Sequence, residues 1–285
     1  VRLGGDVVDD CLAAAEAYAR DTGAVLVPPF DHPLVIAGQG TVGLEIADEA
    51  PDAGVVVVPI GGGGLISGVA TALAHTHRGI RVVGVEAAGA AKMRASLDAG
   101  HPVRLDTIAT IADGIAVKTP SDLTLAHVGA YVDDVVTVSE EEISQAVLLL
   151  AERAKAVVEP SGAVALAAIL AGRVGGTGPA LALCSGGNVD PLLLMRLIDH
   201  GLSAAGRYLV LRIVLPDRPG ALARVTAVVA DLSLNVLDVE HHRAGVRLGV
   251  DEVEVLLTVE TRDPTHRDET VAALRAAGLH VELAR

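Results

Sequence analysis

Aromatic side chains are almost absent from this 285-residue sequence, which has no tryptophan, one phenylalanine and three tyrosines. Proteins that bind single-stranded nucleic acid use aromatic rings on which bases stack, so no such platform is expected. Positive charge is also scarce, because 22 Lys and Arg residues stand against 36 Asp and Glu residues and leave a formal net charge of -14. A basic surface for a phosphate backbone is therefore excluded, and with it nucleic acid as a partner.

Long apolar runs and cysteine pairs are missing as well. No apolar run reaches the ~20 residues that a membrane-spanning helix requires, so no membrane partner is expected. The two cysteines, Cys11 and Cys184, are too few for a disulfide framework and are typical of a reducing compartment such as the cytoplasm. Hydrophobic residues nevertheless make up 51% of the chain, which is ample material for the core of one large domain or two ordinary ones.

Four consecutive glycines, Gly61–Gly64, are the most informative feature that is present. They follow an apolar run over 55–60 and precede a helix-like segment over 65–75. Glycine loses more backbone entropy on folding than any other residue, so a run of glycines needs a specific reason. Bare N–H groups between a strand and a helix N-terminus form a cradle for an anion. A tight turn is the other interpretation, but a turn needs only about one or two glycines. We therefore predict a phosphate or carboxylate site.

Apolar segments alternate with helical patterns through the first two hundred residues. Segments that are apolar on both faces and alternate with helices predict a parallel sheet covered on both sides, with ligands at the carboxyl ends of its strands. Glu86 and Ser185 stand at two such ends, and Ser139 with Glu142 predicts a capping box at the start of a helix. The strands are expected over 24–27, 55–60, 80–85, 135–138 and 180–183. Helices are expected from Asp6 or Asp9 to residue 22, after Thr41 to about Ala50, and from Pro160.

The last eighty residues have a different pattern. The predicted order is a strand over 208–214, a helix over 221–232, strands over 234–240 and 251–259, a helix over 265–277 and a strand over 279–284. This βαββαβ order is the ferredoxin-like arrangement. We place the domain boundary near residues 202–206, which gives one domain over 1–203 and a second over 207–285.

The glycine run alone leaves two phosphate ligands open. Leu65 and Ile66 follow the glycines where a nucleotide-hydrolysing P-loop would have Lys and Ser or Thr, so that class is excluded. Gly62, Gly64 and Gly68 form a loose dinucleotide pattern, with Glu86 about twenty residues on, where an acid would hold the ribose. A nicotinamide-dependent dehydrogenase is therefore an alternative, although it gives no role to the second loop over 184–188.

Five segments carry a resemblance to a known family, namely 58–65, 83–86, 110–114, 158–163 and 184–188, together with 29–41. In this order they resemble the motifs of the fold-type II pyridoxal-phosphate enzymes, whose parallel sheet is of the tryptophan-synthase-β type. Within that group they are similar to threonine ammonia-lyases (threonine dehydratases) and to serine dehydratases and racemases. The segment after residue 206 resembles an ACT domain, with 216–222 as its first loop.

The resemblance implies pyridoxal 5'-phosphate as cofactor and assigns roles to residues. Ser185 would face the pyridine nitrogen, and Asp113 and Glu159 are candidates for the wall of the active site, with buried structural carboxylates as the alternative. The cofactor's phosphate would bind the backbone N–H groups of Gly61, Gly62, Gly63, Gly64 and Leu65.

Two elements of the family's site have no counterpart in the sequence. The lysine that forms the Schiff base and the loop that binds the substrate carboxylate belong to segments upstream of residue 1. None of Lys92, Lys118 and Lys155 lies in the expected setting, so we expect the N-terminal part of the catalytic domain to be missing. Some relatives bind a divalent cation through the equivalents of Glu86, Ala90 and an acid at position 92. Because position 92 is a lysine here, we predict no metal.

The implied reaction is deamination of L-threonine to 2-oxobutanoate and ammonia, with L-serine as a second substrate, in either isoleucine biosynthesis or threonine catabolism. Gly220, Leu222 and Asn235 are expected to bind an amino-acid effector such as isoleucine or valine at a domain interface of a homo-oligomer. An ACT domain that only mediates dimer contacts is the simpler interpretation of that segment. A noncatalytic amino-acid sensor is a further alternative for the whole protein.

Overall fold

The computed structural model describes residues 8–77, 79–243 and 248–284. The chain divides into two compact units, Val1–Leu197 and Ile198–Arg285, and the division falls within helix α8 (Pro191–Ala204). The predicted boundary near 202–206 lies slightly further along, at the end of this helix. Asp6, one of the two expected starts of the first helix, lies outside the described residues. Within the described ranges, no helix is both long and apolar enough to span a membrane.

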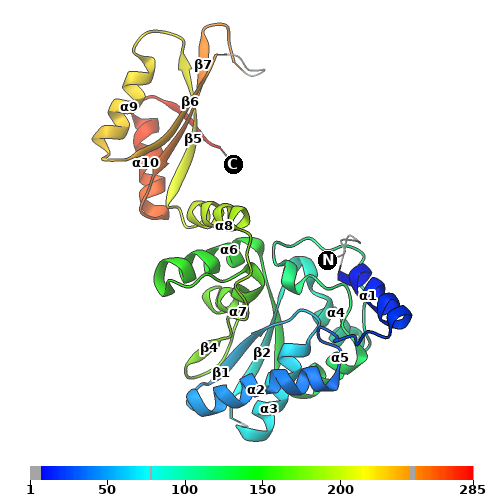
Figure 1. Cartoon of the computed structure of the whole chain (residues 1–285). Coiled ribbons are helices and arrows are strands. Elements are labelled where there is room, and N and C mark those ends of the chain that lie inside the picture. Colours follow the sequence, from blue (N-terminus) through cyan, green and yellow to red (C-terminus); the bar gives the residue numbers. More distant parts are fainter. Residues whose placement is uncertain (1–7, 78, 244–247, 285) are drawn as a thin grey trace. The chain divides into compact units, whose positions relative to one another are not determined.

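The first unit is built on a four-stranded parallel sheet in the order β3-β2-β1-β4 (Figure 1). In register, Val57 of β1 pairs with Val83 of β2 on one side and with Ala182 of β4 on the other. The strands are β1 (Val55–Pro59), β2 (Arg81–Ala87), β3 (Asp134–Val138) and β4 (Ala180–Ala182). The helices are α1 (Val8–Thr22), α2 (Pro33–Glu49), α3 (Gly64–Thr76), α4 (Lys92–Ala99), α5 (Asp122–Tyr131), α6 (Glu140–Leu149) and α7 (Pro160–Leu170). The predicted parallel sheet is confirmed.

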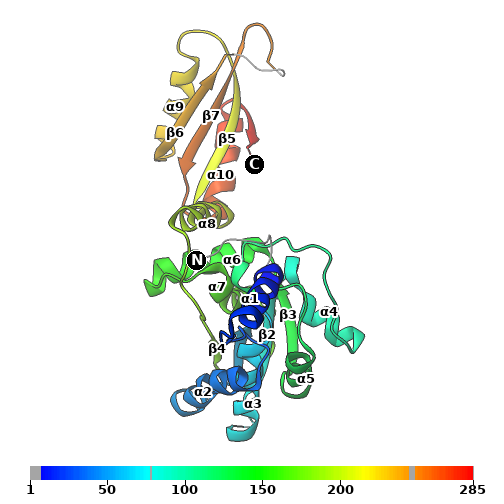
Figure 2. The same cartoon turned by 45° about the vertical axis from the view of Figure 1, so that its right-hand side comes forward.

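Strand β1 shows why the sheet is covered on both faces. All of its residues are buried, and successive side chains of a strand point to opposite faces. Val55 and Val57 belong to a core shared with α6 and α7, whereas Val56 and Val58 belong to a core shared with α2 and α3. Figure 2 shows the sheet between helices of the same unit. A continuous run of valines therefore contributes to two cores at once.

Two predictions for the N-terminal region are wrong. Residues 24–27 form no strand, and Val25 is 91% exposed. No strand among the described residues pairs with this isolated apolar run, so its pattern alone does not produce a strand. Helix α2 begins at Pro33 and not after Thr41, because His32 caps it by accepting a hydrogen bond from Leu34 N–H at Nδ1 (3.1 Å).

The second unit is an antiparallel sheet in the order β6-β7-β5-β8, packed with two helices. Strand β5 alternates buried and half-buried residues, as expected when only one face of a sheet is covered. The elements are β5 (Tyr208–Pro216), α9 (Ala221–Asp231), β6 (Val236–His242), β7 (Glu252–Glu260), α10 (Pro264–Ala276) and β8 (His280–Leu283). The predicted βαββαβ order is confirmed, with each element within a few residues of its expected bounds.

Candidate active site

The glycine run leaves the sheet at the carboxyl end of β1. Ile60 still bonds to β2, because its N–H donates to Val85 O at 2.8 Å. The chain then turns through Gly61, Gly62 and Gly63, and α3 begins at Gly64. Gly63 is the N-cap and has a φ of 95°, which is in the left-handed region that favours glycine. The predicted strand, glycine loop and helix are therefore all present.

The surroundings of the glycines leave no room for side chains. A Cβ on Gly62 would lie 2.3 Å from ring atoms of Phe30. A Cβ on Gly63 would lie 2.9 Å from both Met93 Cε and Thr124 Cβ. The loop is thus pressed onto a floor of three side chains from separate segments, and only bare backbone fits there.

The N–H groups of the loop are buried donors that lack protein acceptors. Gly62, Gly63 and Gly64 are buried, and among the described residues no acceptor bonds the N–H groups from Gly61 to Leu65. A buried backbone donor without a partner is costly, so a ligand is the expected acceptor. The positive end of the α3 dipole lies at the same place and favours an anion. The cradle therefore fits a phosphate group.

The second predicted loop, residues 184–188, leaves the sheet next to the glycine loop. Strand β4 is the parallel neighbour of β1, and Leu183 N–H still donates to Val57 O at 3.0 Å. Ser185 follows on this edge and is exposed. A Cβ on Gly162 in α7 would lie 2.8 Å from Gly186 O, so the start of α7 packs directly on this loop.

Asp113 and Glu159 lie between the two loops. The turn Asp113–Ile115 packs on the glycine loop, since a Cβ on Gly61 would lie 3.3 Å from Ile115 Cα. Glu159 stands just before α7, and its Oε1 would lie 2.1 Å from a Cβ on Gly186. The structure therefore places the predicted cradle, wall residues and second loop along one edge of the sheet.

The environment of Glu159 changes its acidity. Burial raises the pKa of this half-buried carboxyl above its ordinary value of 4.5, and the nearby charge of Asp113 raises it further. A backbone hydrogen bond from Asn188 opposes the two effects. A proton is therefore held more readily on Glu159 than on an isolated glutamate.

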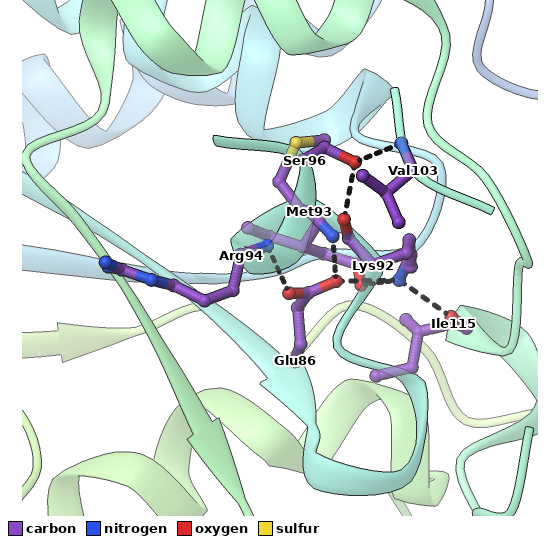
Figure 3. Close-up of polar contacts among 8 residues, drawn as sticks. Glu86, Lys92, Met93, Arg94, Ser96, Val103 and Ile115 are labelled. Atoms are coloured by element: carbon purple, nitrogen blue, oxygen red, sulfur yellow. Dashed lines mark hydrogen bonds and ion pairs between the residues drawn. The ribbon is translucent and has the colours of Figure 1, made fainter. Parts of the chain in front are cut away.

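Glu86 and Lys92 form a buried ion pair (Figure 3), and Lys92 also contacts Ile60 O just before the glycine loop. Glu86 Oε1 and Lys92 Nζ are 3.2 Å apart, and both side chains are fully buried. Because Glu86 is enclosed and paired, it cannot hold the ribose of a dinucleotide, which removes the residue on which that alternative relied. Its place was expected at a strand end, and it lies inside β2 one residue before the end.

Residues 1–186 match the family of pyridoxal-phosphate dependent enzymes, and residues 209–278 match the ACT domain. The chain belongs to the pyridoxal-phosphate dependent enzyme family. The predicted resemblance, the fold class and the cofactor are thereby confirmed.

Named relatives within the pyridoxal-phosphate dependent enzyme family include L-threonine ammonia-lyases. The chain is 44% identical over 284 residues to the L-threonine ammonia-lyase of Geobacter sulfurreducens, and equally to that of Thermotoga maritima. Each match covers 99% of this chain and 71% of the relative. The structure of the processed form of threonine deaminase isoform 2 from Solanum lycopersicum is similar with a TM-score of 0.66 and 36% identity, covering 70% of this chain and 59% of that one.

The predicted effector residues do not come together within one copy of the ACT unit. Gly220 caps α9 just after β5, and Leu222 is half-buried in α9. Asn235 precedes β6 and donates from Nδ2 to Glu260 Oε2 at 3.0 Å. Since Glu260 pairs with Tyr208 at the start of β5, Asn235 and Gly220 lie at opposite ends of the sheet.

Sequence reasoning did not find the floor of the cradle. Phe30, Met93 and Thr124 come from three segments distant in the sequence, and no local pattern marks them as neighbours of the glycines. Phe30 is the single phenylalanine of the chain, which was the one signal available. Lys92 was weighed as a Schiff-base lysine and as a residue that disfavours a metal, but its contacts with two backbone carbonyls depend on the tertiary fold.

Proposed function

We propose that the protein deaminates L-threonine to 2-oxobutanoate and ammonia, with L-serine as a second substrate that yields pyruvate. The observation that carries this proposal is the buried glycine cradle at the carboxyl end of β1, with Ser185 on the neighbouring strand end. The 44% identity with L-threonine ammonia-lyases supports the choice of substrate within the family. The chain spans 71% of those relatives, so the activity is proposed for the full-length protein.

The residues of this chain would hold and orient the cofactor from two sides. The N–H groups from Gly61 to Leu65 would bind its phosphate at the positive end of α3. When bound, pyridoxal phosphate supplies an electron sink for the bond that breaks at Cα. The Ser185 hydroxyl would meet the ring nitrogen without protonating it as a carboxylic acid would, which moderates that sink and favours loss of the β-hydroxyl. Glu159 and Asp113 would form the wall between the two loops.

None of the lysines of this chain is proposed to form the Schiff base. Lys92 is fully buried and bonded to Glu86. Lys118 and Lys155 donate to the backbone carbonyls of Asp106 and Glu152 outside the cradle. The Schiff-base lysine is therefore assigned to no residue of this chain.

The test is an assay of the full-length protein with L-threonine. Release of 2-oxobutanoate, together with an absorbance band typical of a pyridoxal imine, is expected. A noncatalytic amino-acid sensor would bind amino acids through its ACT domain without releasing an oxo acid. Failure to release an oxo acid from L-threonine or L-serine, with the imine band present, would therefore contradict the proposed reaction.

Regulation is proposed to require a second copy of the chain. Strand β6 is an edge strand whose residues are all exposed, including Leu237 at 57%. An exposed edge offers unpaired N–H and C=O groups to another strand. Antiparallel pairing of β6 with its copy would bring Asn235 of one copy near the end of β6 in the other. There Arg243 Nη2 lies 3.5 Å from Asp217 Oδ1, which links that end to the loop before Gly220.

The effector site would thus be completed across a homo-oligomer, with Gly220 and Leu222 from one copy and Asn235 from the other. Backbone groups of a small apolar amino acid such as isoleucine or valine suit this combination of N–H groups and an amide. We propose the cytoplasm as the compartment, because the two cysteines of the sequence are too few for a disulfide framework.

A further inference from the structure

Lys92 makes polar contacts with three separate segments of the chain. Its Nζ lies 3.2 Å from Glu86 Oε1 in β2, 2.9 Å from Ile60 O after β1, and 3.2 Å from Ile115 O in the turn Asp113–Ile115. Figure 3 shows the Lys92 side chain reaching toward Glu86 and Ile115. It is the largest fully buried side chain of the described residues.

The three contacts match the three N–H donors of an ammonium group. A neutral amine would have only two N–H groups and would turn its lone pair toward an acceptor oxygen. Burial lowers the pKa of Lys92, while the charge and the hydrogen bond of Glu86 act in the opposite direction. The geometry therefore describes a charged lysine whose donors are all used.

Glu86 is held just as completely. Its Oε1 also accepts from Met93 N–H and its Oε2 from Arg94 N–H, each at 2.9 Å. These are N–H groups in the first turn of α4, whose N-cap Ala91 offers no side-chain acceptor. Glu86 thus caps α4 from the neighbouring strand, and the helix begins where Lys92 can reach the loop. The pair is rigid because its positions are set by backbone groups.

The contact with Ile60 has a direct effect on the glycine loop. A peptide unit is planar and trans, so the C=O of Ile60 and the N–H of Gly61 lie in one plane and point in opposite directions. Holding the carbonyl therefore orients the first N–H of the cradle. The contact with Ile115 holds the turn against which Gly61 packs, since a Cβ on Gly61 would lie 3.3 Å from Ile115 Cα.

We propose that Lys92 is a positioning residue for the phosphate cradle. By fixing the Ile60–Gly61 peptide and the turn at Ile115, its ammonium group pre-orients the loop for a phosphate monoester. The proposal deepens the proposed function and rests on the glycine loop as the site of the cofactor's phosphate. It gives the buried pair a role in selecting a phosphorylated ligand, beyond its contribution to folding.

The test compares two probes that differ only in the phosphate, pyridoxal 5'-phosphate and pyridoxal, bound to the full-length protein. The variant Lys92→Met keeps the length of the side chain and removes the charge. Without Lys92, Gly61 N–H is no longer held in the orientation that suits the phosphate. Loss of this one charge-assisted hydrogen bond predicts a drop in affinity for pyridoxal 5'-phosphate of about tenfold or more. The affinity for pyridoxal should change much less. Exposed Lys155→Met is the matched control and should leave both affinities unchanged.

Lys92→Met leaves Glu86 buried without its partner, which can prevent folding. The double variant Glu86→Gln with Lys92→Met removes both charges and is measured in parallel, with the same expected selective loss. The positioning role would be overturned if both probes lost affinity equally or if neither affinity changed. It would also be overturned if neither variant bound either probe. If the wild-type protein itself shows no preference for the phosphorylated probe, the proposed function fails instead, because the loop is then no phosphate site.

Discussion

The conformation of Gly63 makes the cradle sensitive to a single methyl group. We expect Gly63→Ala to destabilise the protein by about 2 kcal/mol or more, because a left-handed φ costs an alanine roughly 1–2 kcal/mol and the crowded Cβ adds an overpacking cost. The added Cβ would lie 2.9 Å from Met93 Cε and from Thr124 Cβ. Urea unfolding measures the loss, and the affinity for pyridoxal phosphate should fall with it.

Gly100 provides the matched control for this prediction. It has a similar φ of 73°, but a Cβ there would meet no atom within 4 Å. Gly100→Ala should therefore show only the conformational cost of about 1–2 kcal/mol and leave cofactor affinity unchanged. Equal effects of the two substitutions on cofactor affinity would contradict the assignment of the cradle.

The raised pKa of Glu159 predicts a dependence of stability on pH. Below the ordinary value of 4.5 the carboxyl is protonated in both the folded and the unfolded state. As the pH rises above that value, the unfolded state loses its proton first, so the stability contributed by this group falls until the pH passes the folded-state pKa. Glu159→Gln mimics the protonated form, so its stability relative to the wild type should rise across this window.

Urea unfolding at a series of pH values measures this difference. Because the charge of Asp113 is one cause of the shift, Asp113→Asn in the wild-type background should weaken the pH dependence. A difference between wild type and Glu159→Gln that stays constant with pH would show that burial and Asp113 do not act on this carboxyl as described.

At the scale of elements, the capping box of α6 shows a local signal that survives in the fold. Ser139 Oγ accepts from Glu142 N–H at 3.3 Å, and Glu142 Oε2 accepts from Ser139 N–H at 2.7 Å. We expect Ser139→Ala to cost about 1 kcal/mol in free energy of unfolding, since it removes a helix N-cap. Chemical denaturation measures the loss, with exposed Ser203→Ala in α8 as the control. A cost no larger than that of the control would contradict the capping role.

Elements were predictable where local pattern and long-range pairing agree. Strands β1 and β2 are valine-rich runs whose neighbours in the sheet are also strands, so both tendencies act in the same direction. Residues 24–27 have a similar apolar character, but no strand in the described part of the chain pairs with them, and they remain irregular. Helix α2 starts before the predicted residue because His32 caps its first turn and Pro33 suits its first position. The glycines at 38 and 40 made this start signal hard to recognise in the sequence.

Glycines in α2 also illustrate why helix propensity misleads at a packed interface. A Cβ on Gly43 would lie 2.7 Å from Val69 O, so α2 and α3 approach more closely than side chains permit. Glycine costs roughly 1 kcal/mol in a helix, and here the close packing of two helices offsets it. The helical spacing of these glycines is visible in the sequence, but the sequence does not show which helix packs against them.

For the whole molecule, the exposed edge at β6 predicts how copies associate. We expect Leu237→Lys to weaken self-association, because a charge on this edge opposes pairing with another strand. Sedimentation velocity over a range of concentrations measures the effect, and the response to an amino-acid effector should weaken with it. Leu283→Lys on β8, the strand at the opposite edge with Leu283 52% exposed, is the matched control. An effect of Leu283→Lys as large as that of Leu237→Lys would contradict β6 as the interface.

The sequence by itself determined the fold class, the family and the identity of the loops that form the candidate site. These depend on local patterns, namely apolar runs, glycine runs and their order along the chain, which can be recognised without knowing which segments become neighbours. Only the tertiary structure decided the contacts around those loops. Phe30, Thr124 and Met93 reach the glycines from distant segments, and Lys92 bonds to carbonyls 32 and 23 residues away. Such contacts depend on how strands and helices pack in space, and no short stretch of sequence specifies them.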